Sequence, residues 1–158
     1  TREDCTLSPE ALDVMHRRRG FNGTGYHYYI RKDGTLYLTR SLERIGAHAK
    51  GFNAHSIGIC YEGGLDCRGR PADTRTPEQR AALRLLVHQL LEKFPDCRVC
   101  GHRDLSPDKN GNGEIEPEEW MKACPCFDAE EEFKELVAEG TVETQSKLNY
   151  LKNEKGGK

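Results

Sequence analysis

The segment from Thr76 to Phe94 constrains the fold most, because its pattern predicts one long amphipathic helix. Thr76 and Gln79 have the spacing of a capping box, in which both side chains bond the free backbone N–H groups at a helix start. Apolar residues then recur on one helical face until Pro95 ends the helix: Leu83, Leu86, Val87, Leu90 and Phe94. A helix with one apolar face must pack against another layer, so the chain needs a sheet or further helices beside it.

Short strand patterns and two further helix patterns surround this segment. Ser8 before Pro9 is a helix start, and Asp33-Gly34 between two aromatic runs is a hairpin turn. The expected helices cover residues 9–19 and 129–139, and the expected strands cover residues 27–31, 35–39, 56–61 and 98–100. This order predicts an α/β fold with a mixed central β-sheet flanked by helices, in a single domain over residues 1–140 with a polar C-terminal tail over residues 141–158.

Charge and hydropathy exclude two classes of partner. The chain has 24 basic and 26 acidic residues, which leave no net field to attract nucleic acid or an anionic membrane surface. No run approaches the roughly 20 apolar residues that span a bilayer, so no membrane insertion is expected. The seven cysteines are an odd number and cannot all pair within the chain, which favours a reducing compartment. The sequence carries no oligomer signature, and we expect a monomer.

His102 and Cys124 are the residues whose chemical types suggest a metal site. His102 follows a predicted strand, and Cys124 lies beyond an intervening loop in the string KACPC. Imidazole and thiolate groups are ligands suited to Zn²⁺. Their separation in the sequence does not show that they meet, and such residues are more often a surface histidine and a buried free cysteine.

Four strings of the sequence, in this order, carry a resemblance to a known family. They are GYHYYIRKDGTLYLTR, GAHAKGFNAHSIGICYEGG, GHRDLSPD and KACPCFDA. Together they resemble the type 2 N-acetylmuramoyl-L-alanine amidases, which include lysozyme-like amidases of bacteriophages and peptidoglycan recognition proteins. The resemblance covers about residues 8–135, and four ordered motifs are far more specific than any one of them.

The resemblance implies a role for each of five residues. His102 and Cys124 match the second and third zinc ligands of the family, and Tyr26 and Lys122 match its catalytic tyrosine and lysine. His48 matches a histidine that lines the substrate groove. The implied reaction is hydrolysis of the amide bond that joins the lactyl group of N-acetylmuramic acid to L-alanine in peptidoglycan. Zinc would activate a water molecule, and the tyrosine and lysine would stabilise the developing oxyanion.

The chain departs from the family at its first zinc ligand. That ligand is a histidine in a hydrophobic strand upstream of a small-residue stretch, and this sequence begins where the stretch would end. His16 lies on the first predicted helix, and Asp4 and Cys5 are poor substitutes. We therefore expect weak zinc binding and impaired activity, and we interpret the sequence as a truncated product or incomplete gene model of an active parent.

An independent motif lies between His102 and Cys124. Residues 108–119 match the pattern D-x-N-x-N-G-x-I-x-x-x-E of an EF-hand calcium loop. The expected ligands are Asp108, Asn110, Asn112, the carbonyl of Glu114, and Glu119, with Glu116 in a water-mediated contact. The alternative is an Asn/Gly-rich surface loop that binds no ion. A bound Ca²⁺ would have a structural role, because it would fix the distance between the two zinc ligands.

The main hypothesis is therefore a Zn²⁺-dependent amidase that acts on peptidoglycan. The alternative is a non-catalytic peptidoglycan-binding module, because family members that lose a zinc ligand can retain the groove. Lys122 and Cys124 favour the enzyme, since a binding module has no chemical need for either. A calcium-responsive interaction protein is a third interpretation, supported only by the loop. We expect the protein to be cytoplasmic until it is released or exported to the cell wall.

Overall fold

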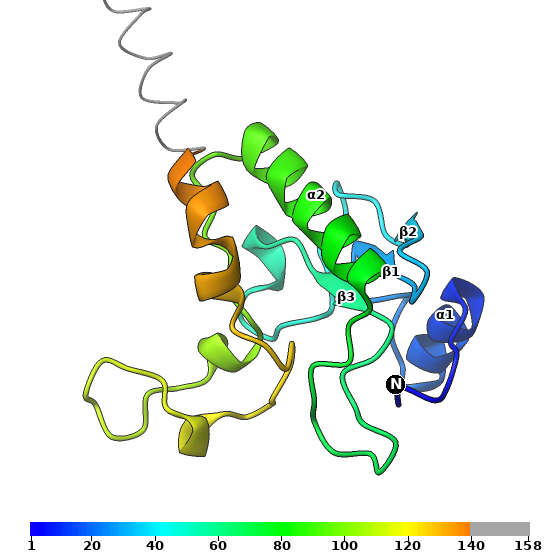
Figure 1. Cartoon of the computed structure of the whole chain (residues 1–158), viewed down its shortest axis with the longest axis horizontal. Coiled ribbons are helices and arrows are strands. Elements are labelled where there is room, and N and C mark those ends of the chain that lie inside the picture. Colours follow the sequence, from blue (N-terminus) through cyan, green and yellow to red (C-terminus); the bar gives the residue numbers. More distant parts are fainter. Residues whose placement is uncertain (140–158) are drawn as a thin grey trace, which may run out of the picture.

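A small mixed sheet lies at the centre of the molecule (Figure 1). The computed structural model describes residues 1–139, so the predicted tail over residues 141–158 lies outside the described part. Strand β1 (Tyr28–Ile30) pairs antiparallel with β2 (Leu36–Leu38) and parallel with β3 (Ile59–Tyr61), which gives the order β2-β1-β3. The predicted hairpin and the mixed sheet are thus confirmed.

Helix α2 (Pro77–Lys93) forms where the capping box predicts it. The Thr76 side chain accepts a hydrogen bond from the Gln79 amide, and the Gln79 side chain accepts one from the Thr76 amide. Gln79 is fully buried, and its Nε2 also donates to the carbonyls of Ile30 and Glu62 at 3.3 and 2.9 Å. One side chain therefore starts the helix and joins it to the ends of β1 and β3.

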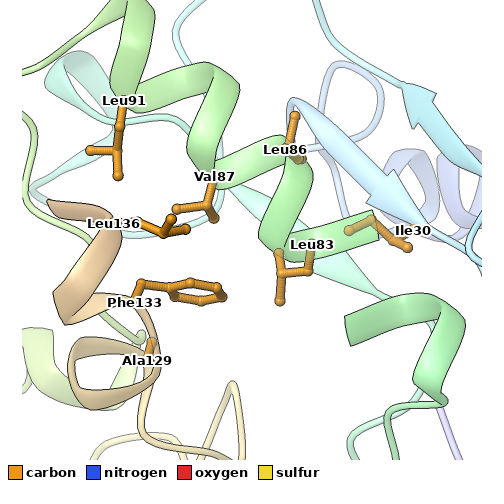
Figure 2. Close-up of a cluster of buried hydrophobic side chains, with 8 residues drawn as sticks. All are labelled: Ile30, Leu83, Leu86, Val87, Leu91, Ala129, Phe133 and Leu136. Carbon is orange, nitrogen blue, oxygen red and sulfur yellow. The ribbon is translucent and has the colours of Figure 1, made fainter. Parts of the chain in front are cut away.

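A further helix over residues 129–139 packs beside α2 and completes the core, as predicted. Figure 2 shows Phe133 and Leu136 on this helix facing Leu83 and Val87 of α2. The core cluster consists of Ile30, Leu83, Leu86, Val87, Leu91, Ala129, Phe133 and Leu136. The buried cluster thus comes from two helices and Ile30 of β1, and the partly buried Tyr28, Ile59 and Tyr61 of the sheet pack against it.

Helix α1 (Pro9–Arg18) begins at the predicted N-cap and ends one residue before the predicted limit. Ser8 accepts a hydrogen bond from the Ala11 amide at 3.2 Å. The His16 imidazole is buried and accepts a hydrogen bond at Nδ1 from the Gly25 amide at 2.9 Å. The helix therefore fixes the backbone that leads into β1.

Two predictions on the C-terminal side of α2 are wrong. Residues 98–100 do not form a strand, because Val99 packs against the core without a strand partner and Arg98 is exposed in an ion pair with Glu130. On α2 itself, Leu90 packs against the core as the pattern predicts, although it is only partly buried, and Leu91, which the pattern omitted, is buried. Phe94, expected on the apolar face, is the C-cap residue and is likewise only partly buried.

A buried arginine joins the C-terminal helix to the segment before α2. The Arg75 side chain has no exposed surface and donates to Asp73 and to both carboxylate oxygens of Glu132, the latter at 2.7 Å each. Its guanidinium lies 3.2 Å from the centroid of the Phe127 ring. Burial opposes ionisation of Asp73, but the hydrogen bonds and charge of Arg75 outweigh it and lower the pKa of Asp73 to about 2.

Among residues 1–139, no helix combines the length and apolar character that a bilayer-spanning segment needs.

Candidate active site

Tyr26 and His27 enter the site from the turn before β1. Gly25 approaches Ala47 so closely that a Cβ atom at this position would lie 2.4 Å from the Ala47 carbonyl oxygen, so only glycine fits. His27 is buried and accepts a hydrogen bond at Nδ1 from the Gly58 amide at 3.0 Å. Its Nε2 therefore carries the proton and donates to the Arg44 carbonyl at 3.0 Å. His27 thus joins three separate backbone segments beneath Tyr26.

His48 packs between Tyr26 and His27. Its ring is stacked on Tyr26 with the centroids 6.2 Å apart and meets His27 edge-on at 5.7 Å. A Cβ atom at Gly46 or Gly58 would lie 2.5 or 2.4 Å from His48 Cδ2, so the two glycines make room for the ring. Burial lowers the pKa of His48 to about 4, with further lowering from His27 and His102. The imidazole is therefore neutral at neutral pH.

The Nε2 atom of His48 is buried and lacks a hydrogen-bond partner. A buried polar atom without a partner costs free energy, which makes such an atom a candidate contact for a ligand. The backbone on both sides of the ring is held by Asn53, whose Oδ1 accepts from the amides of His48 and Ala49 at 2.8 Å each. The ring is thus presented by a loop that is itself anchored.

His102 stands at the start of a short 3₁₀ helix, Arg103–Leu105. Burial lowers the pKa of His102, and the nearby Lys122 ammonium lowers it further. The neutral imidazole that results is the form that binds metals. Burial raises the pKa of the Cys124 thiol, while Lys122 acts in the opposite direction. Lys122 is itself exposed, so its charge lies at the surface next to both groups.

Electrostatic and ring contacts connect the five site residues that the sequence predicts. Tyr26 stacks on His48, and a protonated His102 would repel a charged His48, which contributes to the lowered pKa of His48. Lys122 influences both His102 and Cys124, and the pKa of Tyr26 is raised by burial and then by Cys60 and Cys124. The structure therefore brings Tyr26, His48, His102, Lys122 and Cys124 together, although His102 and Cys124 lie on either side of a long loop.

Two residues of this region were not predicted from the sequence. His27 orients the backbone below Tyr26 and His48, and its position next to Tyr26 in the chain was the one available signal. Cys60 on β3 is partly buried, and burial raises the pKa of its thiol to about 12, so it is a neutral group in the floor of the site. Nothing in the residues around Cys60 marks it as close to Cys124.

The zinc site implied by the resemblance is not complete in the described residues. Between residues 1 and 139, no three or more His, Cys, Asp or Glu side chains converge so that they could hold a metal ion. His102 and Cys124 suit zinc in kind but are fewer than the three protein ligands of a catalytic zinc site. The acidic side chains of residues 108–119 do not form such a group either.

The loop of residues 108–119 projects away from the sheet (Figure 1). The Asp108 carboxylate accepts hydrogen bonds from the amides of Gly111 and Gly113 at 2.6 and 2.8 Å. Glu119 is buried, and its carboxylate accepts from the Lys109 amide at 2.6 Å. The hydrogen bonds from Gly113 and Gly111 lower the pKa of Asp108. Hydrogen bonds from the Glu116 and Lys109 amides lower the pKa of Glu119, so both carboxyl groups are charged at neutral pH. The side chains at the first and last positions of the motif therefore both bind backbone amides of this loop.

The other expected calcium ligands lie along the same loop. The side-chain oxygens of Asn110 and Asn112 accept hydrogen bonds from the amides of Asn112 and Glu114, at 2.9 and 2.8 Å. Gly113, at the sharp turn, has a positive φ of 88°. At the base of the loop, Ser106 Oγ accepts from the Met121 amide at 3.0 Å. The two ends of the loop are thus joined before the chain continues to Lys122.

Comparison with known proteins identifies the family. Residues 3–126 match the family model described as N-acetylmuramoyl-L-alanine amidase. The endolysin of Enterobacteria phage K11 is 35% identical over 142 residues, which are 84% of this chain and 85% of that protein. Peptidoglycan-recognition protein LB of Drosophila melanogaster is 33% identical over 110 residues, 65% of this chain and 44% of that protein.

A solved structure agrees with this assignment. N-acetylmuramoyl-L-alanine amidase LysC from Clostridium intestinale URNW is similar with a TM-score of 0.62 and 30% identity, covering 86% of this chain and 77% of that one. The family model and the solved structure thus indicate the same family. The chain belongs to the N-acetylmuramoyl-L-alanine amidase family.

Proposed function

We propose that the protein hydrolyses the amide bond between the lactyl group of N-acetylmuramic acid and L-alanine in peptidoglycan. The observation that supports this most is the convergence of Tyr26, His48, His102, Lys122 and Cys124 in a chain that belongs to the amidase family. These residues come from four separate segments, so their convergence is a property of the fold and not of one local motif.

The side chains supply the groups that amide hydrolysis needs. Cleavage passes through a tetrahedral intermediate whose oxygen gains negative charge, and fixed donors near that oxygen lower the barrier. Lys122 is a surface cation beside His102 and Cys124, and burial raises the pKa of Tyr26, which keeps its hydroxyl protonated as a donor. The neutral His48, with its free Nε2, is available to bind a polar group of the substrate.

We further propose that His102 and Cys124 bind Zn²⁺. Their donor types support this, since a neutral imidazole and a cysteine sulfur are common zinc ligands. Two ligands from residues 1–139 are expected to hold the ion weakly, because each missing protein ligand lowers affinity. Activity of the chain is accordingly expected to be impaired relative to a site with three ligands.

The alternative function is recognition of peptidoglycan without cleavage. The incomplete ligand set among the described residues favours it, and so does the similarity to a protein named for peptidoglycan recognition. A binding module needs the surface that carries His48 but has no chemical need for Lys122 or Cys124.

Purified chain incubated with insoluble peptidoglycan distinguishes the two functions. An amidase releases stem peptides with a new free amino group on L-alanine, which mass spectrometry detects, and its zinc content by elemental analysis should rise with activity. A recognition module co-sediments with the peptidoglycan and releases no stem peptides. If the chain neither releases stem peptides nor co-sediments with the peptidoglycan, both functions are contradicted.

We also propose that residues 108–119 bind Ca²⁺ in a structural role. The complete match to the calcium-loop pattern supports this, together with two charged carboxylates at the first and last motif positions. On binding, Glu119 would exchange backbone N–H partners for the ion, so the loop would be held by the ion in place of its own amides.

Replacing Glu119 with Gln is expected to remove the calcium effect, because it deletes the bidentate ligand at position 12. In the unmodified chain, calcium at about 100 times its dissociation constant should add about 2.7 kcal/mol to the free energy of unfolding. Thermal unfolding with and without calcium measures this, and the fluorescence of Trp120, the one tryptophan of the chain, reports on the loop next to it.

Glu118→Gln is the matched control, because Glu118 is exposed and occupies a non-ligand position in the same short 3₁₀ helix, Pro117–Glu119. It should keep the calcium-dependent shift in full. An unmodified chain whose unfolding is the same with calcium and with chelator would show that the loop binds no ion.

A further inference from the structure

The segment that carries Lys122 and Cys124 has no regular secondary structure and is held from outside. The Arg103 amide donates to the Cys124 carbonyl at 2.9 Å, and the Cys126 thiol donates to the Gly64 carbonyl at 3.2 Å. The first bond comes from Arg103, the first residue of the short 3₁₀ helix that follows His102. The second uses a weak S–H donor. A firmer attachment to the sheet is therefore needed if Cys124 is to keep its position.

Tyr61 supplies this attachment. It is the last residue of β3, and its hydroxyl donates to the Pro125 carbonyl at 2.7 Å, which is a short and well-formed hydrogen bond. Its ring also packs against Phe127, with the centroids 6.4 Å apart. Pro125 follows Cys124 directly, so the hydroxyl reaches the peptide unit next to the predicted zinc ligand.

The strand on which Tyr61 lies connects the two halves of the site. β3 is paired in parallel with β1, and the register places Tyr61 opposite Ile30 and Ile59 opposite Tyr28. Tyr26 and His27 immediately precede β1, and Gly58, just before β3, donates to His27. A contact from Tyr61 to Pro125 therefore sets the Cys124 segment relative to the same sheet that carries Tyr26.

We infer that Tyr61 is a positioning residue for the amidase reaction, which acts by holding the segment 122–126 through its hydrogen bond to Pro125. The expected effect of Tyr61 on catalysis rests on the proposed function. Burial raises the pKa of Tyr61, so the hydroxyl remains a donor throughout the neutral range. The residue contacts neither the predicted zinc ligands nor the catalytic side chains with its hydroxyl, so its effect is indirect.

Tyr61→Phe tests this, because it removes the hydroxyl and leaves the ring against Phe127. Tyr29→Phe is the matched control: Tyr29 lies on β1, and its hydroxyl donates to the Leu7 carbonyl at 2.9 Å and not to the segment 122–126. Both variants are made in the full chain. For each, kcat and KM for release of stem peptides from solubilised muropeptides are measured, together with hydrogen exchange of the backbone over residues 122–128 and the thermal unfolding midpoint.

We expect Tyr61→Phe to lower kcat about tenfold with little change in KM, as is usual for outer residues that orient a metal ligand, and to speed exchange over residues 122–128. Tyr29→Phe should lower the unfolding midpoint to a similar extent and leave kcat and that exchange unchanged. Equal kcat and equal exchange in the two variants would overturn the inference. If the unmodified chain releases no stem peptides, the proposed function fails, and exchange alone then decides whether Tyr61 holds the segment.

Discussion

Replacing Phe133 with Ala should lower the free energy of unfolding by about 3–5 kcal/mol, the cost of deleting a fully enclosed aromatic ring. Phe133 is 2% exposed and fills the space between α2 and the helix over residues 129–139, where Leu83 and Val87 face it (Figure 2). Its ring also meets Phe127 edge-on at 6.4 Å. Thermal unfolding should move down by about 10 °C, given the usual relation between free energy and midpoint for a chain of this size.

Leu85→Ala is the control for this substitution. Leu85 lies on α2 but is 60% exposed, so truncating it should change the free energy of unfolding by no more than about 0.5 kcal/mol. Denaturant titration of the two variants beside the unmodified chain gives both values. If Phe133→Ala were no more destabilising than Leu85→Ala, the two helices would not share the core described here.

Lys122→Met is expected to reduce the rate of stem-peptide release about 100-fold or more, the usual effect of removing one donor to a developing oxyanion. The substitution keeps the length of the aliphatic chain and removes only the charge. Because Lys122 is exposed, the unfolding midpoint and the binding of the chain to peptidoglycan should change little. The measurement is the initial rate of release on solubilised muropeptides, together with co-sedimentation on insoluble peptidoglycan.

Lys93→Met provides the comparison, since Lys93 is an exposed lysine at the end of α2, away from the site. It should retain the full rate. A Lys122→Met variant that is as active as Lys93→Met would show that Lys122 has no part in catalysis.

Local chemistry made the helices predictable. The Thr76 and Gln79 side chains and the Ser8 N-cap act within a few residues of their partners, so their effects are encoded locally. The predicted strand over residues 98–100 failed because a strand needs a neighbour, and the position of a neighbour is a property of the whole fold. The burial of Leu91, which the pattern omitted, depends in the same way on the neighbours that α2 meets in the folded chain.

The site was predictable only in part, for a similar reason. The types of His102 and Cys124 suggest metal binding, but their convergence follows from contacts such as Arg103 to Cys124 that no spacing rule contains, and the family resemblance was required to pair them. The function of His27 depends on Gly58 and Arg44, which lie far along the chain. Resemblance to a family assigns roles to the residues that align with its motifs. Supporting residues such as His27 are identified only in the folded structure.

The hydrogen bond between Ser106 and Met121 makes the stretch between them a replaceable module. Since its ends are already joined, shortening or lengthening this stretch changes the closure entropy of the chain by only about 0.6 kcal/mol for each doubling of length. The molecule therefore offers a natural place for grafting: tags, sensors or foreign loops can be inserted there while the residues on both sides keep their places. The same tolerance would allow related proteins to gain or lose this loop without rebuilding the segment that carries Cys124.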